Sequence, residues 1–222
     1  MRKYSPLIGW PMRNPKQHRF TMPNEIWNHK LGPIQFLIFS YLCYCQNHHQ
    51  FDELILKMIA NSVHSTESTV KKYIESLIHK GLSTDSWSLS ASLQYSNGGN
   101  FFTLPNEIFL LNLPPSAFMV YAYLLLIEDR KTHTCHPSYN TIAAETGLSK
   151  NTALKSIDIL LDAGLITVEP SSYFDRRGMK WKGNNLYTIL PIRSAIDILH
   201  QRQLRKLEID VAKSRLAAQS AV

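Results

Sequence analysis

The apolar residues of this chain occur mainly in long, nearly continuous blocks or in stripes. The two longest blocks, Ile34–Cys45 and Ala117–Ile127, are too short to cross a bilayer and are typical of buried helices. The stripes repeat at i, i+4, i+7 and i+8, which predicts amphipathic helices with one buried face. They are formed by Ala153, Ile157, Leu160 and Leu161, and by Val70, Ile74, Leu77 and Ile78.

Capping residues and a glycine before the stripe that begins at Ala153 predict two short helices joined by a tight turn. Ser138 can cap a helix over residues 139–146, Gly147 can end it in a left-handed conformation, and Ser149 can cap the helix that carries the stripe. Two helices joined by a three-residue turn with glycine make a helix-turn-helix. In such a unit the second helix enters the DNA major groove with its N-terminal residues.

The residues after Gly164 are typical of a β-wing. The segments "LITVEP" and "NNLYTILP" read as strands, and the loop "SSYFDRRGMKWKG" lies between them. A strand, a basic loop and a return strand after a helix-turn-helix indicate a winged helix domain. The bases of this loop are placed to contact phosphates or a minor groove; they are Arg176, Arg177, Lys180 and Lys182.

The chain repeats itself at a spacing of about 82 residues. Residues 20–42 and 102–124 are identical at 11 of 23 positions, and after a one-residue insertion residues 59–82 and 142–165 are identical at 8 of 24. A match that resumes in register after a loop indicates an internal duplication. In the first copy Thr66 replaces Ser149 as the cap, and His64-Ser65 stands where the second has Gly147-Leu148.

We therefore predict a mainly α fold with small β-wings, made of tandem winged helix-turn-helix domains and a C-terminal helix. The expected parts are a basic arm (1–19), a first domain (20–97), a second domain (101–191) and a C-terminal helix or arm (192–222). Residues 97–99, Asn-Gly-Gly, mark a turn between the domains. Leu204, Leu207 and Val211 give the tail a short heptad-like seam, so it can dimerise, dock on the repeats or trail as a basic arm.

Charge suggests the partner. The net charge is +7, but residues 1–19, 170–183 and 192–222 carry +5, +3 and +3, which leaves −4 for the rest. Bases gathered on protruding segments favour an anionic polymer over a merely solvated surface. The first repeat lacks this feature, because residues 83–99 hold one acid, Asp85, and no base. DNA binding is therefore better supported for the second repeat, while the first has packing or dimerisation as an equal alternative.

The residues "LPNEIF", "EDRKTH", "HPSYNTIAAETGLSKNT", "LDAGLI" and "NNLYTILP" resemble the winged helix proteins of bacterial plasmids, phages and conjugative elements, which include replication initiators. The resemblance covers residues 102–191 well and 20–95 loosely. It implies double-stranded DNA binding through the helix that begins near Ser149, in a transcriptional regulator or a replication-initiator-type protein. The alternative is a protein–protein module for assembly or partition, in which the winged helices mediate dimerisation.

Site residues follow from the faces of the two predicted recognition helices. Asn151 can pair bidentately with adenine, and lysines can meet guanine acceptors or phosphates. The second repeat contributes Ser149, Lys150, Asn151, Thr152 and Lys155, besides Arg176, Arg177, Lys180 and Lys182 of the wing. From the first repeat we expect Ser68, Lys71 and Lys72, with Lys72 a phosphate contact at most because its domain lacks a basic wing.

Other function classes find little support. The clusters around Cys43, Cys45 and His48, and around His133 and Cys135, lack the paired spacing of a structural zinc site, so we predict no metal and buried thiols instead. No phosphate loop or hydrolase motif points to an enzyme, and no cofactor or small-molecule ligand is expected. Reduced cysteines and the lack of a secretion signal place the chain in the cytoplasm without membrane contact. A homo-oligomer stays open.

Overall fold

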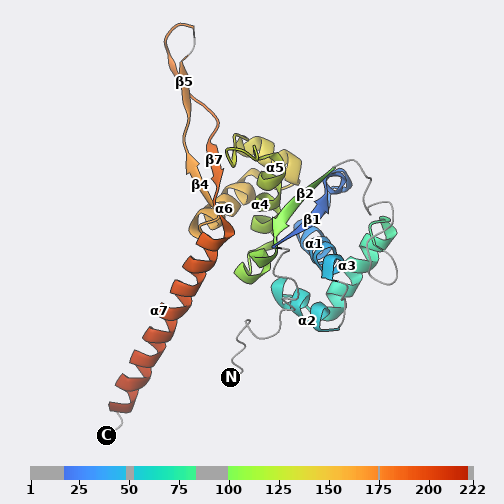
Figure 1. Ribbon diagram of the computed structural model, residues 1–222, viewed down its shortest axis with the longest axis vertical. Helices are drawn as coiled ribbons and strands as arrows, with labels where there is room; N and C mark the ends of the chain where they lie inside the picture. Colours follow the sequence, from blue (N-terminus) through green and yellow to red (C-terminus); the bar gives the residue numbers. More distant parts are fainter. Residues whose placement is uncertain (1–17, 49–52, 84–99, 175, 220–222) are drawn as a thin grey trace.

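A computed structural model describes residues 18–48, 53–83, 100–174 and 176–219 of the chain (Figure 1). The described part is mainly helical, with three small antiparallel sheets ordered β1-β2, β3-β7-β4 and β5-β6. This composition is consistent with a winged helix fold. None of the described helices is both long and apolar enough to cross a membrane.

The first sequence repeat begins with a strand and continues as helices. Arg19, which the sequence placed at the end of the basic arm, is instead the first residue of β1. The central helix α1 carries the apolar block and is buried along most of its length. The elements are β1 (Arg19–Pro23), the 3₁₀ helix η1 (Asn24–His29), α1 (Pro33–His48), α2 (Glu53–Ser62) and α3 (Glu67–His79).

The second repeat has the same order of elements, with the short strand β3 added between its first two α-helices. Its central helix, α4, starts at Pro115, where a missing N–H costs nothing, and it is buried from Ala117 to Leu125. The elements are β2 (Phe101–Pro105), the 3₁₀ helix η3 (Asn106–Leu111), α4 (Pro115–Ile127), β3 (Thr134–Cys135), α5 (Tyr139–Thr146) and α6 (Lys150–Asp162).

Four strands and a long helix complete the chain. Strand β7 lies between β3 and β4, and the β5–β6 hairpin extends from the end of that sheet. The basic segment predicted as a loop is therefore itself partly a hairpin, and the segment after α4 contains the short strand β3. The elements are β4 (Ile166–Glu169), β5 (Ser172–Phe174), β6 (Lys180–Lys182), β7 (Leu186–Ile189) and α7 (Ile192–Gln219).

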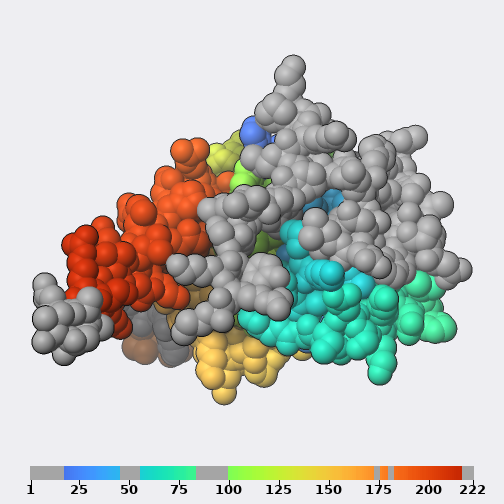
Figure 2. Space-filling view, turned by 90° about the horizontal axis from the view of Figure 1, so that it is seen from below, coloured from blue at the N-terminus to red at the C-terminus, as the bar shows by residue number. Residues whose placement is uncertain are grey.

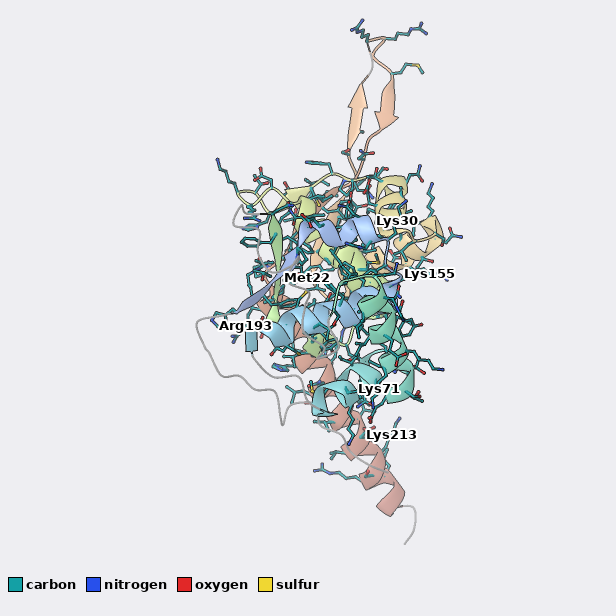
Figure 3. The ribbon with its side chains drawn as sticks, turned by 90° about the vertical axis from the view of Figure 1, so that its right-hand side faces the viewer. Met22, Lys30, Lys71, Lys155, Arg193 and Lys213 are labelled. Atoms are coloured by element: carbon teal, nitrogen blue, oxygen red, sulfur yellow. The ribbon has the colours of Figure 1, made fainter. Side chains whose placement is uncertain are left out.

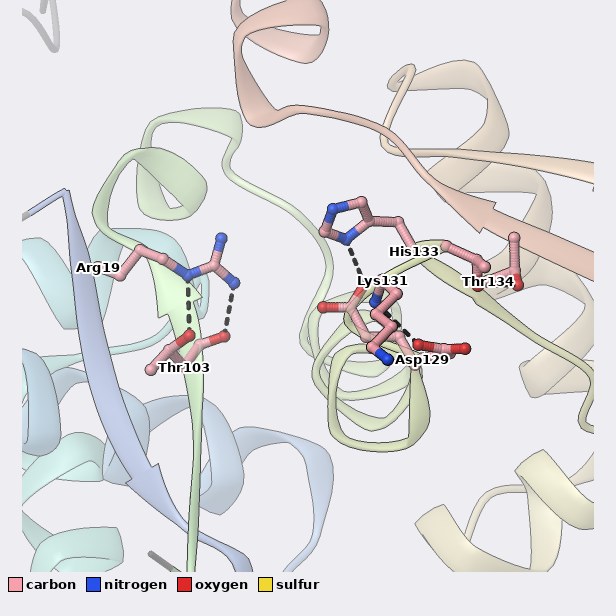
Figure 4. Close-up of polar contacts among 8 residues, drawn as sticks. Arg19, Thr103, Asp129, Lys131, His133 and Thr134 are labelled. Carbon is pink, nitrogen blue, oxygen red and sulfur yellow. Dashed lines mark hydrogen bonds and ion pairs between the residues drawn. The ribbon is translucent and has the colours of Figure 1, made fainter.

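The two repeats meet along a seam formed by the antiparallel pair β1–β2 and by helices α1 and α4 (Figure 1). Arg19 reaches across this seam: its guanidinium donates to the hydroxyl of Thr103 at 2.8 Å and to the carbonyl of Thr103 at 2.9 Å (Figure 4). The buried apolar residues from Phe20 to Ala195 form one continuous cluster. Two tandem domains would each enclose a core of their own, and the structure differs from this picture because the seam between the repeats is itself apolar. The domain limits 20–97 and 101–191 stay predictions.

The buried stripes agree with the pattern, with differences at one edge. Ala153, Ile157 and Leu160 are buried as expected, but Leu161 is 38% exposed. One residue along a helix turns the side chain by about 100°, which carries Leu161 past the face that packs on α4. In the first repeat Ile78 is likewise only half-buried, whereas Val70, Ile74 and Leu77 are buried.

The three cysteines are free and buried, as the sequence predicted. Burial raises the pKa of the Cys135 thiol to about 12, with a smaller contribution from the Glu128 carboxylate. The pKa of Cys43 is raised well above its usual range for the same reason, desolvation. These thiols are therefore protonated and unreactive at neutral pH.

Candidate nucleic-acid interface

The turn between α5 and α6 is built as the sequence predicts. The Ser138 hydroxyl caps α5 by accepting from the backbone N–H of Thr141 at 3.0 Å, and Gly147 ends it with φ +69°. The Ser149 hydroxyl then caps α6 by accepting from the N–H of Thr152 at 3.1 Å. A left-handed residue lets the second helix start so soon, and glycine takes that conformation without strain.

The exposed face of α6 carries polar side chains at its N-terminal end. Lys150, Asn151 and Lys155 are exposed, while Ala153 and Ile157 on the opposite face hold the helix against the core. No acid stands in the first turn of α6, so the positive end of the helix dipole is not offset there. This end of the helix suits an anionic partner.

Two of the predicted site residues, Ser149 and Thr152, form hydrogen bonds at the N-terminal cap of α6. The hydroxyls of Ser149 and Thr152 lie 2.8 Å apart and share a hydrogen bond. Thr152 is half-buried, and Ser149 already serves the backbone of α6. Their contribution is therefore to fix the start of α6, which positions the neighbouring Lys150 and Asn151.

The wing projects beyond the body of the protein (Figures 1 and 3). Arg176 and Arg177 are exposed in the turn between β5 and β6, where Gly178 takes φ +75°. Lys180 and Lys182 are the first and last residues of β6. At the neck of the hairpin the Gly183 N–H donates to the carbonyl of Ser171 at 2.9 Å. The structure thus gathers the four predicted wing residues on one projecting hairpin, separate from the exposed face of α6.

The first repeat builds an equivalent turn from different residues. His64 has φ +50°, the left-handed conformation that Gly147 takes in the second repeat. The Thr66 hydroxyl caps α3 by accepting from the N–H of Thr69 at 3.3 Å. Replacement of glycine by histidine therefore leaves the turn intact, at the cost of backbone strain. The sequence signal for this was weak, because histidine rarely takes this conformation.

The predicted residues of α3 lie on its exposed face. Ser68, Lys71 and Lys72 are all exposed, and the Ser68 hydroxyl lies 2.8 Å from that of Thr66. Glu67 stands in the first turn of α3, where α6 has Lys150. The α3 start is therefore less attractive to an anion than the α6 start. The segment 84–97, where a first wing was expected, lies outside the described residues.

The C-terminal helix α7 is held against the end of α6. The Arg202 guanidinium donates to the carbonyl of Asp162 at 2.6 Å, and Ala195 and Ile198 pack closely on Gly164. A side chain at position 164 would collide with Ile198, so this contact requires glycine as well as its φ of +71°. Beyond this anchor α7 extends away from the body of the protein (Figures 1 and 2). Docking on the repeats was one of three alternatives that the sequence left open for this helix, but the sequence did not indicate which residues make the contact.

Comparison with known proteins finds a family for part of the chain. Residues 111–166, about a quarter of the sequence, match the helix-turn-helix domain family. A solved structure described as a possible transcriptional regulator from Methanosarcina mazei Go1 is similar at 18% identity with a TM-score of 0.33; the match covers 50% of this chain and 89% of that one. No curated protein sequence matches at a significant level. The matched segment contains α4, α5 and α6.

Proposed function

We propose that the protein binds double-stranded DNA sequence-specifically through two winged helix repeats. It acts as a transcriptional regulator or as a replication-initiator-type protein of a bacterial mobile element. The observation that carries the proposal is α6: a capped helix, in a segment that matches a helix-turn-helix family, with Lys150, Asn151 and Lys155 exposed at its leading end. In helix-turn-helix proteins these positions meet base edges.

Asn151 is the residue that best tests sequence reading. Its amide can donate to and accept from one adenine edge, so its loss removes discrimination rather than attraction to phosphates. We expect Asn151→Ala to cost about 1–3 kcal/mol on the preferred duplex and little on a scrambled duplex. Competition binding on both duplexes measures this difference. Equal losses on the two duplexes would assign Asn151 to backbone positioning and remove the support for specificity through α6.

The wing arginines test the phosphate contribution. Arg176→Ala with Arg177→Ala should weaken binding to all sequences and reduce the slope of log K against log salt, because phosphate contacts release counterions. A matched control is Arg193→Ala with Arg205→Ala on exposed positions of α7, which removes the same charge elsewhere. An unchanged salt slope in the wing variant would mean that the hairpin does not lie on DNA.

The two biological roles are separated by placing the selected site in two contexts. Repression or activation of a reporter whose promoter overlaps the site supports a regulator, and maintenance of a plasmid whose origin carries the site supports an initiator. The proposal includes no catalytic step. Supercoiled DNA incubated with the protein and Mg²⁺ should therefore stay intact, and nicking would contradict it.

Self-association is a second candidate role, and α7 favours it. Leu204 and Leu207 are each 60% exposed and Val211 is 50% exposed, at the i, i+3, i+7 spacing of a coiled-coil seam. A second copy of α7 would cover them in a self-complementary contact. Such an association would join two chains that each keep their own α6 free for DNA.

A further inference from the structure

The pairing of β1 with β2 is symmetric with respect to the sequence repeat. Thr21 lies opposite Thr103, its own counterpart 82 residues later. On either side Phe20 pairs with Leu104 and Met22 pairs with Phe102, so each pair is the exchanged copy of the other. This register places a local pseudo-two-fold axis between Thr21 and Thr103.

Other contacts across the seam obey the same axis. The N–H of Asn24 donates to the carbonyl of Asn100 at 3.1 Å, and its counterpart Asn106 donates to the carbonyl of His18 at 3.0 Å. Ring contacts are exchanged as well: Trp27 meets Tyr123 at 5.6 Å between centroids, and Tyr41 meets Phe109 at 4.0 Å. These contacts form the pattern of an isologous homodimer interface within one chain.

The symmetry reaches the recognition helices. Residues 67–79 of α3 and 150–162 of α6 correspond at an offset of 83, and each helix is followed by a glycine with φ +71°, Gly81 and Gly164. Lys71 and Lys155 both lie to the right of Met22 in Figure 3, so α3 and α6 lie on the same side of β1. The view from below agrees, with the α2–α3 and α5–α6 regions at one edge and β1 at the other (Figure 2).

From this symmetry we infer that one chain reads two inverted half-sites, α6 on one and α3 on the other. Helix-turn-helix dimers bind pseudo-palindromic sites because their two-fold axis coincides with that of the duplex. Here the axis relates the two repeats of a single polypeptide, so a single chain meets both halves. This inference rests on the proposed function and adds the form of the site and a direct role for the first repeat.

The two half-sites differ because the helix faces differ. Glu67, Ser68 and Lys71 of α3 correspond to Lys150, Asn151 and Leu154 of α6, whereas Lys72 and Lys155 are alike. An acid at the start of α3 opposes phosphate where α6 offers a base. The site is therefore an imperfect inverted repeat, with a strong half read by α6 and a weaker half read by α3.

Transplanting the α6 face onto α3 tests the inference. Bound duplexes are selected from a random pool with the wild-type chain and with the variant Glu67→Lys, Ser68→Asn, Lys71→Leu. This variant gains one unit of net charge, so Glu208→Gln on α7 is the matched control. We expect the wild type to select unequal inverted half-sites, the grafted chain a perfect palindrome, and the control the wild-type sequence. On the palindrome the grafted chain should bind at least tenfold more tightly than the wild type.

Stoichiometry and orientation decide the remaining outcomes. We expect one chain for each duplex by native mass spectrometry, and Glu67→Lys alone should already strengthen binding to the weak half-site. Four outcomes would each overturn the inference while specific binding through Asn151 still stands. They are selection of direct repeats, selection of a single half-site, binding of two chains to one inverted site, and an unchanged consensus for the grafted chain. If the wild type enriches no sequence at all, the proposed function itself fails, and this inference fails with it.

Discussion

Phe109 offers the sharpest test of the shared core. It belongs to the second repeat but is 7% exposed among aromatic rings of the first. Its centroid lies 4.0 Å from that of Tyr41 and 5.5 Å from those of Phe20 and Tyr44, while Phe118 of its own repeat lies at 5.6 Å. Replacement of Phe109 therefore damages contacts on both sides of the seam.

The magnitude follows from burial. An aromatic side chain buries about 150–250 Å², and at about 25 cal/mol per Å² most of this is lost in Phe109→Ala. With the cavity that remains, we expect the free energy of unfolding to fall by about 4 kcal/mol, within the range of about 3–5 kcal/mol typical of such changes. The free energy of unfolding of a whole domain is only about 5–15 kcal/mol, so a loss of this size can unfold the protein. Phe109→Leu is therefore the second variant, with an expected loss of about 1–2 kcal/mol from the ring contacts.

Hydrogen exchange followed by mass spectrometry reads both repeats at once. Peptides from α3 and α6 should lose the same free energy of protection, because one core unfolds as one unit. Ile209→Ala, at a position 54% exposed on α7, should change either value by less than about 0.5 kcal/mol. If α6 loses protection in the Phe109 variants while α3 keeps its wild-type value, the repeats are independent domains and the reasoning from a continuous core is wrong.

Three further predictions concern the turns, the alkaline range and α7. In denaturant titrations His64→Gly should raise the free energy of unfolding by about 0.5–1 kcal/mol, and Gly147→Ala should lower it by about 1–2 kcal/mol. Both positions are left-handed, a conformation that glycine adopts without strain and other residues do not. Changes of the same sign in the two variants would contradict the shared turn geometry. Burial raises the pKa of Tyr44, of Tyr187 and of Cys135 to about 12, so the folded chain keeps protons that the unfolded chain releases above about pH 9–10. The free energy of unfolding should therefore fall as the pH rises from about 9 to 12, and it should fall less steeply in Tyr187→Phe. A free energy of unfolding that does not change over this range would refute the prediction. Leu204→Asp with Leu207→Asp should abolish any concentration-dependent association in sedimentation, whereas association that persists in this variant would place the contact elsewhere than on the seam of α7.

Local chemistry explains what the sequence could predict. The caps Ser138 and Ser149 and the left-handed Gly147 depend on neighbours within a few residues, so their spacing was enough to locate α5 and α6. The wing followed in the same way from its strands and bases. The residue-by-residue match between the copies likewise indicates a duplication from the sequence alone.

Long-range contacts explain what it could not predict. The register of β1 with β2 joins residues about 80 positions apart, and short strands such as "RFTMP" carry no signal of their partner. The one continuous core follows from that pairing and was missed with it. His64 was missed for a different reason: the surrounding helices impose a conformation that its own preference disfavours.

The seam also sets an order of events during synthesis. Strand β1 leaves the ribosome long before β2 exists, and the closure of so long a loop is entropically slow. Until residue 105 is made, Phe20 and Met22 belong to an open strand edge whose best partner is β2. Because the register is symmetric about Thr21, the β1 strand of another nascent chain fits that edge almost as well. The same symmetry that closes one chain on itself thus makes each unfinished chain a suitable partner for the β1 strand of its neighbour.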